Sequence, residues 1–311
     1  MPKKQKSDLT ELKGLVEDYL RSSGEEASDK DNLSYMAIPL AIKYYSMLAK
    51  NDPGSIGNAD FQFLFGLVRI FSTNDSQHGY DMRLGLLEKS SLRDQGDLRK
   101  ILEDGRSRKS TMGMFTHKME YNLSPEHISD DSARNFIILC TLVFELLQLD
   151  KREQALEVLN EGLRKNDHKG IGKGFSSDIL HCLDPDVFPI LNDSQDNGTT
   201  IYEALGVEFK SICPENYVEN IGRLQRYRDK FYPEKSFRTL DNAQNCAEVA
   251  ECLSRLKKSG KLDRQYWIFR TMRARGEEGI SSLGEGDARM YALGLSSGDD
   301  GSDREYAFFD I

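Results

Sequence analysis

The chain has 311 residues, of which 38% are hydrophobic and 30% are charged, as is ordinary for a soluble globular protein. No run approaches the roughly 18 apolar residues that a membrane-spanning helix needs, and no apolar segment typical of a secretory signal follows the basic N-terminus. Five scattered cysteines without a C-x-x-C pair favour reduced thiols. These features exclude membrane and secreted classes and predict an intracellular, cytoplasmic protein.

Apolar residues recur at helical spacing over most of the chain, and no run alternates as a strand would. The pattern predicts helices at 8–21, 36–48, 61–71, 91–103, 133–149, 152–165, 201–207, 217–231, 243–258 and 264–275. Pro53-Gly54 separates the second helix from the third, Gly105 is expected to end the fourth, and Asp130 or Asp131 is expected to cap the fifth. The fold class expected is therefore all-α.

The domain organisation follows from composition and length. We expect an N-terminal helical subdomain at 1–128 and a second at 129–275, each a helical bundle. Residues 276–311 are rich in Gly, Ser and Asp, which predicts a mobile acidic tail.

The net charge of −9 is unevenly distributed. Residues 276–311 carry nine acids and two arginines, a net charge of −7. Residues 206–275 carry fifteen lysines and arginines against nine acids, a net charge of +6. The total charge argues against nucleic-acid binding, but its distribution leaves a basic body in which such binding is expected.

Residues 163–192 predict a helix-hairpin-helix. One helix ends near Lys165, and a Gly-Ile-Gly turn at 170–172 opens a second helix, with Ile171 pointing inward to pin the turn. The first N–H groups of the second helix have no partner within it, so they form an anion site suited to a phosphate. The residues expected to bind the DNA backbone here are Lys169, Gly170, Gly172, Lys173 and Gly174.

These residues resemble the helix-hairpin-helix superfamily, including its DNA glycosylases. They are still more similar to helical regions that accompany McrB-type restriction ATPases and related defence proteins. The resemblance covers residues 162–206 and is carried by Gly170, Gly172, Ile179-Leu180-His181, Asp184-Pro185-Asp186-Val187-Phe188-Pro189-Ile190 and Asn192. It implies binding of duplex DNA and a role in restriction or phage defence, with the chemistry supplied by an ATPase or nuclease partner protein.

Departures from the glycosylase pattern argue against base excision. The catalytic Asp of those enzymes lies about twenty residues after the second glycine, where this chain has Asn192, and an amide cannot act as the base. Gly174 replaces the Lys nucleophile of bifunctional members. Asp193 is then the weak candidate for a catalytic residue. A diverged glycosylase that uses Asp193 and a protein-interaction module without a nucleic-acid role are the two alternatives.

Cofactor and metal sites are not expected, apart from a monovalent cation that related hairpins hold through backbone carbonyls. No group of His and Cys has metal-ligand spacing. His181 is expected to pack or to hydrogen-bond at a helix end.

Two further segments have more than one interpretation. In 223–232, the cations Arg223, Arg226, Arg228 and Lys230 alternate with aromatic residues. This pattern predicts either a stripe that binds the phosphate backbone, with aromatic stacking, or a solvated helix face over a core. Arg106, Arg108 and Lys109 would add a smaller phosphate contact.

The tail ends in Phe308, Phe309, Asp310 and Ile311. Three interpretations are open: the tail docks a partner, it mimics nucleic acid on the basic region, or it only solubilises the chain.

Overall fold

A computed structural model of the protein describes residues 3–22, 32–70, 76–113, 128–165, 171, 173–191, 207, 216–243 and 246–258. The side chains of 3–9, 76, 173–176, 257 and 258 lie outside this description. The chain forms two units, one of residues 2–251 and one of Met1 with residues 252–311.

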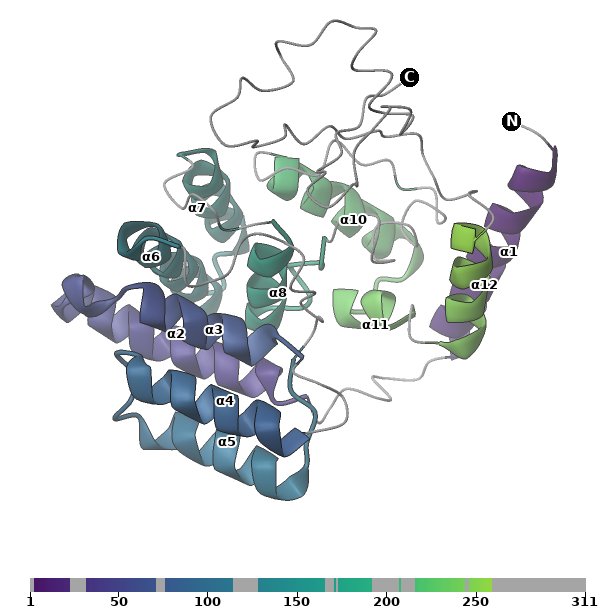
Figure 1. The fold of residues 1–311 in the computed structure, drawn as a ribbon. Coiled ribbons are helices and arrows are strands. Elements are labelled where there is room, and N and C mark those ends of the chain that lie inside the picture. The colour runs from purple at the N-terminus through teal and green to yellow at the C-terminus, as the bar shows by residue number, and fades with distance from the viewer. Residues whose placement is uncertain are drawn as a thin grey trace, which may run out of the picture. The chain divides into compact units, whose positions relative to one another are not determined.

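The regular elements of the described residues are helices, and none of these residues forms a strand (Figure 1). They are α1 (Lys3–Ser22), α2 (Ser34–Asn51), the short 3-10 helix η1 (Pro53–Ser55), α3 (Asn58–Val68), α4 (Ser76–Lys89), α5 (Gly96–Arg108), α6 (Asp130–Gln148), α7 (Arg152–Lys165), α8 (Lys173–Leu183), α10 (Tyr217–Phe231), α11 (Phe237–Asn242) and α12 (Ala247–Lys258). The prediction of an all-α protein is confirmed.

Several helix boundaries differ from those expected. α5 begins after the expected start, continues through Gly105, and ends at Arg108 with Lys109 in the left-handed region at φ 55°. Residues 243–258 do not form one helix, because α11 ends at Asn242 and α12 begins at Ala247. α4 was not expected. The helices expected at 201–207 and 264–275 lie outside the described helical residues.

The cap expected for α6 is also wrong. The hydroxyl oxygen of Ser129 accepts a hydrogen bond from the Ser132 N–H and caps the helix. Asp130 has a different partner, because its Oδ1 accepts a hydrogen bond of 2.7 Å from the N–H of Asn58. A carboxylate in the first turn still suits the positive end of the helix dipole.

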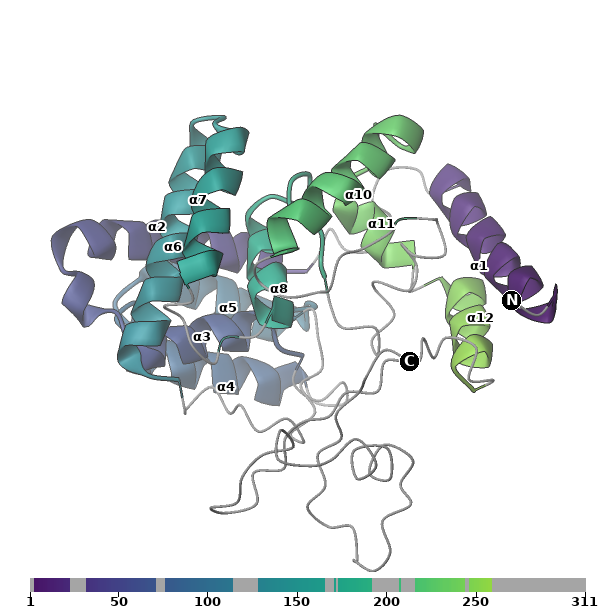
Figure 2. The same ribbon diagram turned by 90° about the horizontal axis from the view of Figure 1, so that it is seen from above.

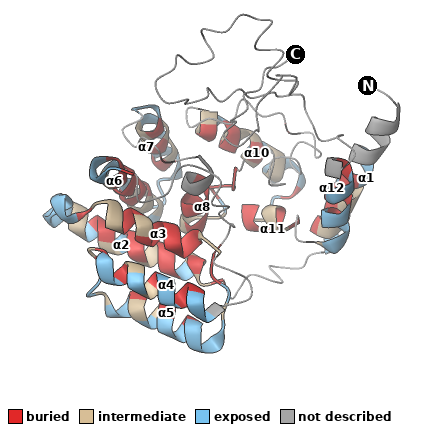
Figure 3. Cartoon of the chain, viewed as in Figure 1, coloured by how far each residue is buried: buried red, intermediate tan, exposed pale blue. Residues whose placement is uncertain are grey.

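The core is built around α2, which packs on α3, α5, α6 and α8. Its apolar residues come from both halves of the chain, from Ala37 in α2 through Phe136 in α6 to Ile179 in α8. Figure 3 shows buried positions concentrated on α2 and α3, while α4 and α5 carry many exposed ones. The boundary expected at residue 128 therefore falls within a shared core.

Among the residues that the structure describes, no helix is both long enough and apolar enough to cross a membrane.

Candidate nucleic-acid interface

The predicted hairpin is described only in part. α7 ends at Lys165 and α8 begins at Lys173, as the sequence predicts, and Ile171 between them is buried in the core. Residues 166–170 and 172 lie outside the described residues, and these include Lys169, Gly170 and Gly172. Lys173 and Gly174 are placed by their backbone in the first turn of α8. The anion site at the turn therefore stays a prediction.

The two helices that flank the turn have different neighbours. α7 packs on α6, along which it runs in Figure 2, and it also contacts α10. α8 packs on α2 and α3. The last turn of α7 ends in Arg164 and Lys165, both exposed, directly before the predicted turn. The predicted turn is therefore preceded by two exposed cations.

α10 is an amphipathic helix with its apolar side against the body of the protein. Tyr217, Ile221 and Leu224 are buried at helical spacing. Arg223 lies closer to the surface, and its Nη2 pairs with Oε1 of Glu219 at 3.1 Å, one turn earlier on the helix. That cation is already partly neutralised.

Arg228 belongs to the packing of α10. Its side chain is only 13% exposed, and its guanidinium donates hydrogen bonds to the carbonyl of Asp186 and to Oδ1 of Asp229. The guanidinium carbon also lies 4.6 Å from the centre of the Phe237 ring in α11. Arg228 therefore links α10 to the turn after α8 and to α11, and its donors are occupied.

Arg226 and Lys230 are exposed, one helical turn apart, and neither forms an ion pair with a described residue. Nζ of Lys230 lies 4.9 Å from the centre of the Phe231 ring, and Phe231 is 53% exposed. The ring of Tyr227 is 4.9 Å from that of Phe231, centre to centre. We call Arg226, Tyr227, Lys230 and Phe231 the α10 surface. It combines positive charge that has no ion-pair partner among the described residues with an accessible aromatic ring.

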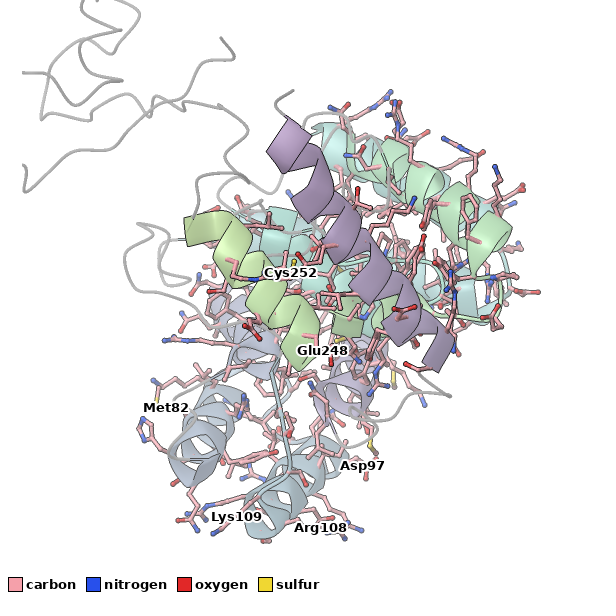
Figure 4. The ribbon with its side chains drawn as sticks, turned by 90° about the vertical axis from the view of Figure 1, so that its right-hand side faces the viewer. Met82, Asp97, Arg108, Lys109, Glu248 and Cys252 are labelled. Atoms are coloured by element: carbon pink, nitrogen blue, oxygen red, sulfur yellow. The ribbon has the colours of Figure 1, made fainter. Side chains whose placement is uncertain are left out.

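The smaller basic segment is elsewhere. Arg106, Arg108 and Lys109 are exposed at the end of α5, and Arg106 pairs with Asp81 at 3.0 Å. Figure 4 labels Arg108 and Lys109 at this end, and α5 packs on α4 and α2. The structure does not bring these cations to the α10 surface.

The remaining predicted site residues are not placed. Asn192, Asp193 and the tail residues Phe308, Phe309, Asp310 and Ile311 all lie outside the described residues. Within the described part of the chain, no group of three or more His, Cys, Asp or Glu residues is arranged to hold a metal ion.

His181 hydrogen-bonds near the end of α8, as expected, and it belongs to a buried polar cluster that the sequence did not reveal. Its Nδ1 lies 2.6 Å from the carbonyl oxygen of Phe188, and its Nε2 lies 3.0 Å from the hydroxyl of Tyr35. Burial lowers the pKa of His181 to about 4, the bond to Phe188 opposes this shift, and the nearby charge of Arg238 adds to it. The ring is therefore neutral at pH 7, with Nδ1–H donating to Phe188 and Nε2 accepting from Tyr35.

Asp178 lies one turn before His181 and is also buried. Burial raises the pKa of Asp178 well above its usual range, and the nearby Asp241 raises it further. Both effects disfavour the charged form of the Asp178 carboxyl group. Arg238 and Asp241 both come from the six-residue helix α11, whose position against α8 has no signature in the sequence.

Comparisons of the sequence with family models and with curated proteins, and of the structure with solved structures, find no significant match.

Proposed function

We propose that this protein binds nucleic acid through the phosphate backbone, with the α10 surface as the described part of the interface. The observation that carries the proposal is the pair Arg226 and Lys230, exposed beside Phe231 and without an ion-pair partner among the described residues. Cations of this kind displace counterions from phosphates when they bind, which makes the affinity favourable and dependent on salt. The exposed ring of Phe231 offers an additional stacking surface.

The position of α10 supports the same function. α10 contacts α7, and the last turn of α7 carries Arg164 and Lys165 into the predicted hairpin. Phosphate contacts from α10, from the end of α7 and from the hairpin would therefore come from neighbouring parts of the fold. Contacts to phosphates fix the position of the protein on the nucleic acid without reading its sequence.

Duplex DNA is the nucleic acid that we propose, because residues 162–206 resemble the hairpin of restriction and defence proteins. The same resemblance supports a role in restriction or phage defence, in which a partner ATPase or nuclease carries out the chemistry. The protein itself would hold the DNA.

The proposal is tested with the double substitution Arg226→Gln and Lys230→Gln, assayed for binding to a labelled duplex by fluorescence anisotropy over a series of salt concentrations. We expect the wild-type affinity to fall linearly with salt on logarithmic axes. The double variant should bind more weakly, with a slope smaller by about 2, because two phosphate contacts are lost.

A matched control removes the same charge elsewhere. Lys43 in α2 and Lys100 in α5 are exposed, and Lys43→Gln with Lys100→Gln should leave the slope unchanged. Equal losses in the two double variants would show a general charge effect and contradict an interface at α10. Wild-type protein that fails to bind DNA even at low salt would overturn the proposal in favour of a protein-interaction module.

A further inference from the structure

Arg238 in α11 is a buried arginine with an unused hydrogen-bonding edge. The residue is 8% exposed, and its Nε and Nη2 are buried without a hydrogen-bond partner in the part of the chain that the structure describes. In a guanidinium group, Nε–H and Nη2–H lie on the same edge, which binds the two oxygens of a carboxylate or phosphate at once. Leaving such donors buried and unbonded costs free energy, so the edge requires an explanation.

The other buried arginine shows how this fold treats a purely structural guanidinium. Arg83 is 3% exposed, and its Nε donates to the carbonyl of Gly66 at 2.8 Å. Its Nη2 donates to the carbonyls of Arg69 at 2.7 Å and Met112 at 2.9 Å. The same two nitrogens that are bonded in Arg83 are the unbonded ones in Arg238.

The guanidinium of Arg238 is held in place over an aromatic ring. Its central carbon lies 4.1 Å from the centre of the Tyr35 ring. That ring is fixed in turn, because the Tyr35 hydroxyl is bonded to His181, and His181 to the carbonyl of Phe188. This contact is made without a hydrogen bond from Nε or Nη2, so it leaves those two donors available. The donors are therefore positioned before any ligand arrives, which lowers the entropic cost of binding.

The neighbouring groups on α8 do not supply the missing acceptor. Burial raises the pKa values of the Asp178 carboxyl and the Cys182 thiol well above their usual ranges, which disfavours the charged form of each. His181 is neutral at pH 7. None of these groups accepts a hydrogen bond from Nε or Nη2 of Arg238. Asp241 lies one turn along α11 and contributes negative charge, but it accepts no hydrogen bond from Nε or Nη2 of Arg238.

We propose that the Nε/Nη2 edge of Arg238 binds a small oxyanion, a phosphate or carboxylate group, in a bidentate manner. The site uses no residue of the α10 surface, so it is independent of the proposed DNA interface. Both nitrogens are sealed from solvent, so a ligand as large as a nucleic-acid duplex cannot reach them. Binding would supply the two acceptors that the buried charge lacks.

The test measures the melting temperature with inorganic phosphate and, in a separate arm, with acetate, each against chloride at the same ionic strength. Wild type is compared with Arg238→Met and Arg238→Lys. We expect at least one anion to raise the wild-type melting temperature by several degrees near saturation. The rise should be absent in Arg238→Met and reduced in Arg238→Lys, which keeps the charge but loses the bidentate edge. The arm with the larger rise identifies the phosphate or the carboxylate as the ligand.

Stability without the anion distinguishes this site from a structural arginine. Arg238→Met removes an unsatisfied buried charge, so in chloride it should melt at or above the wild-type temperature. Arg83→Met serves as the control and should melt well below it, with or without phosphate. A large destabilisation of Arg238→Met in chloride would overturn the proposal. An equal anion-induced rise in wild type and Arg238→Met would also overturn it, because that result reflects only the general stabilising effect of such salts.

Discussion

At the scale of single residues, burial determines what the imidazole of His181 can do. Nδ1–H donates to the carbonyl of Phe188 and Nε2 accepts from the hydroxyl of Tyr35, so no lone pair remains for a metal ion. Burial also lowers the pKa of the ring to about 4, which removes it from acid–base chemistry near neutral pH. The role of His181 is to position Tyr35, and through the Tyr35 ring to position Arg238.

The lowered pKa of His181 predicts a specific dependence of stability on pH. The unfolded chain takes up this proton near pH 6.5 and the folded chain near pH 4, so between these values the unfolded state holds more protons. The contribution of His181 is therefore complete above pH 6.5 and is lost as the pH falls toward 4. The loss amounts to roughly 3 kcal/mol in the free energy of unfolding.

Urea unfolding of wild type and His181→Gln between pH 7 and pH 4 measures the contribution of His181 to the free energy of unfolding. The advantage of wild type over the variant should shrink as the pH falls. The comparison with the variant is needed because Asp178 acts in the opposite direction: its raised pKa gives stability at low pH that is lost as the pH rises. A wild-type advantage that stays constant over this range would show that His181 is not held neutral.

At the scale of elements, the sequence predicted the helices whose apolar spacing is regular. α7 and α10 match their expected bounds to the residue. α4 was missed because its mixture of Met, Leu, Gly and polar residues gives little helical periodicity. α5 was placed wrongly because Gly105 was interpreted as a helix end, whereas in the structure it lies inside the helix at a close contact.

The contact at Gly105 predicts the effect of adding one methyl group. A Cβ at this position would lie 2.7 Å from two ring carbons of Tyr80 and 2.5 Å from Cδ1 of Leu33. The Tyr80 ring is buried and its hydroxyl is bonded to the carbonyl of Ser110, so it cannot easily move away. We expect Gly105→Ala to lower the free energy of unfolding by about 1–3 kcal/mol.

Gly85 in α4 provides the matched control, because a Cβ there would meet nothing within 4 Å. Gly85→Ala should raise the free energy of unfolding by about 0.5–1 kcal/mol through helix propensity alone. Chemical denaturation of both variants tests the pair. If Gly105→Ala were as stable as Gly85→Ala, the close packing of α5 against Tyr80 would be wrong.

The candidate site was predictable to the level of a basic helix, but not to the level of individual residues. The alternation of cations and aromatic residues in 223–232 identified α10. Only the fold separates the paired Arg223 and the packed Arg228 from the exposed Arg226 and Lys230, because that division depends on which elements surround the helix. The burial of Arg238 depends on contacts with Tyr35, distant in sequence, and no local pattern encodes it.

At the scale of the whole molecule, the uneven charge bears directly on the proposed DNA binding. Residues 276–311 hold a net charge of −7, and the rest of the chain holds only −2. An acidic segment lowers the affinity of a chain for DNA by repelling the duplex. This effect is electrostatic and is therefore screened by salt.

A variant of the 311-residue chain in which the nine acids of residues 276–311 are replaced by their amides tests this electrostatic effect. We expect it to bind duplex DNA about tenfold more tightly than wild type at low salt, with the advantage shrinking at 0.15 M salt, where the Debye length is about 8 Å. Phe308→Ala with Phe309→Ala keeps all nine acids and should leave the affinity unchanged, because the expected effect comes from charge. If the amide variant bound DNA no more tightly than wild type at low salt, the acidic segment would not oppose DNA binding. Docking of a partner by its apolar end, or a solubilising role, would then be the function to test.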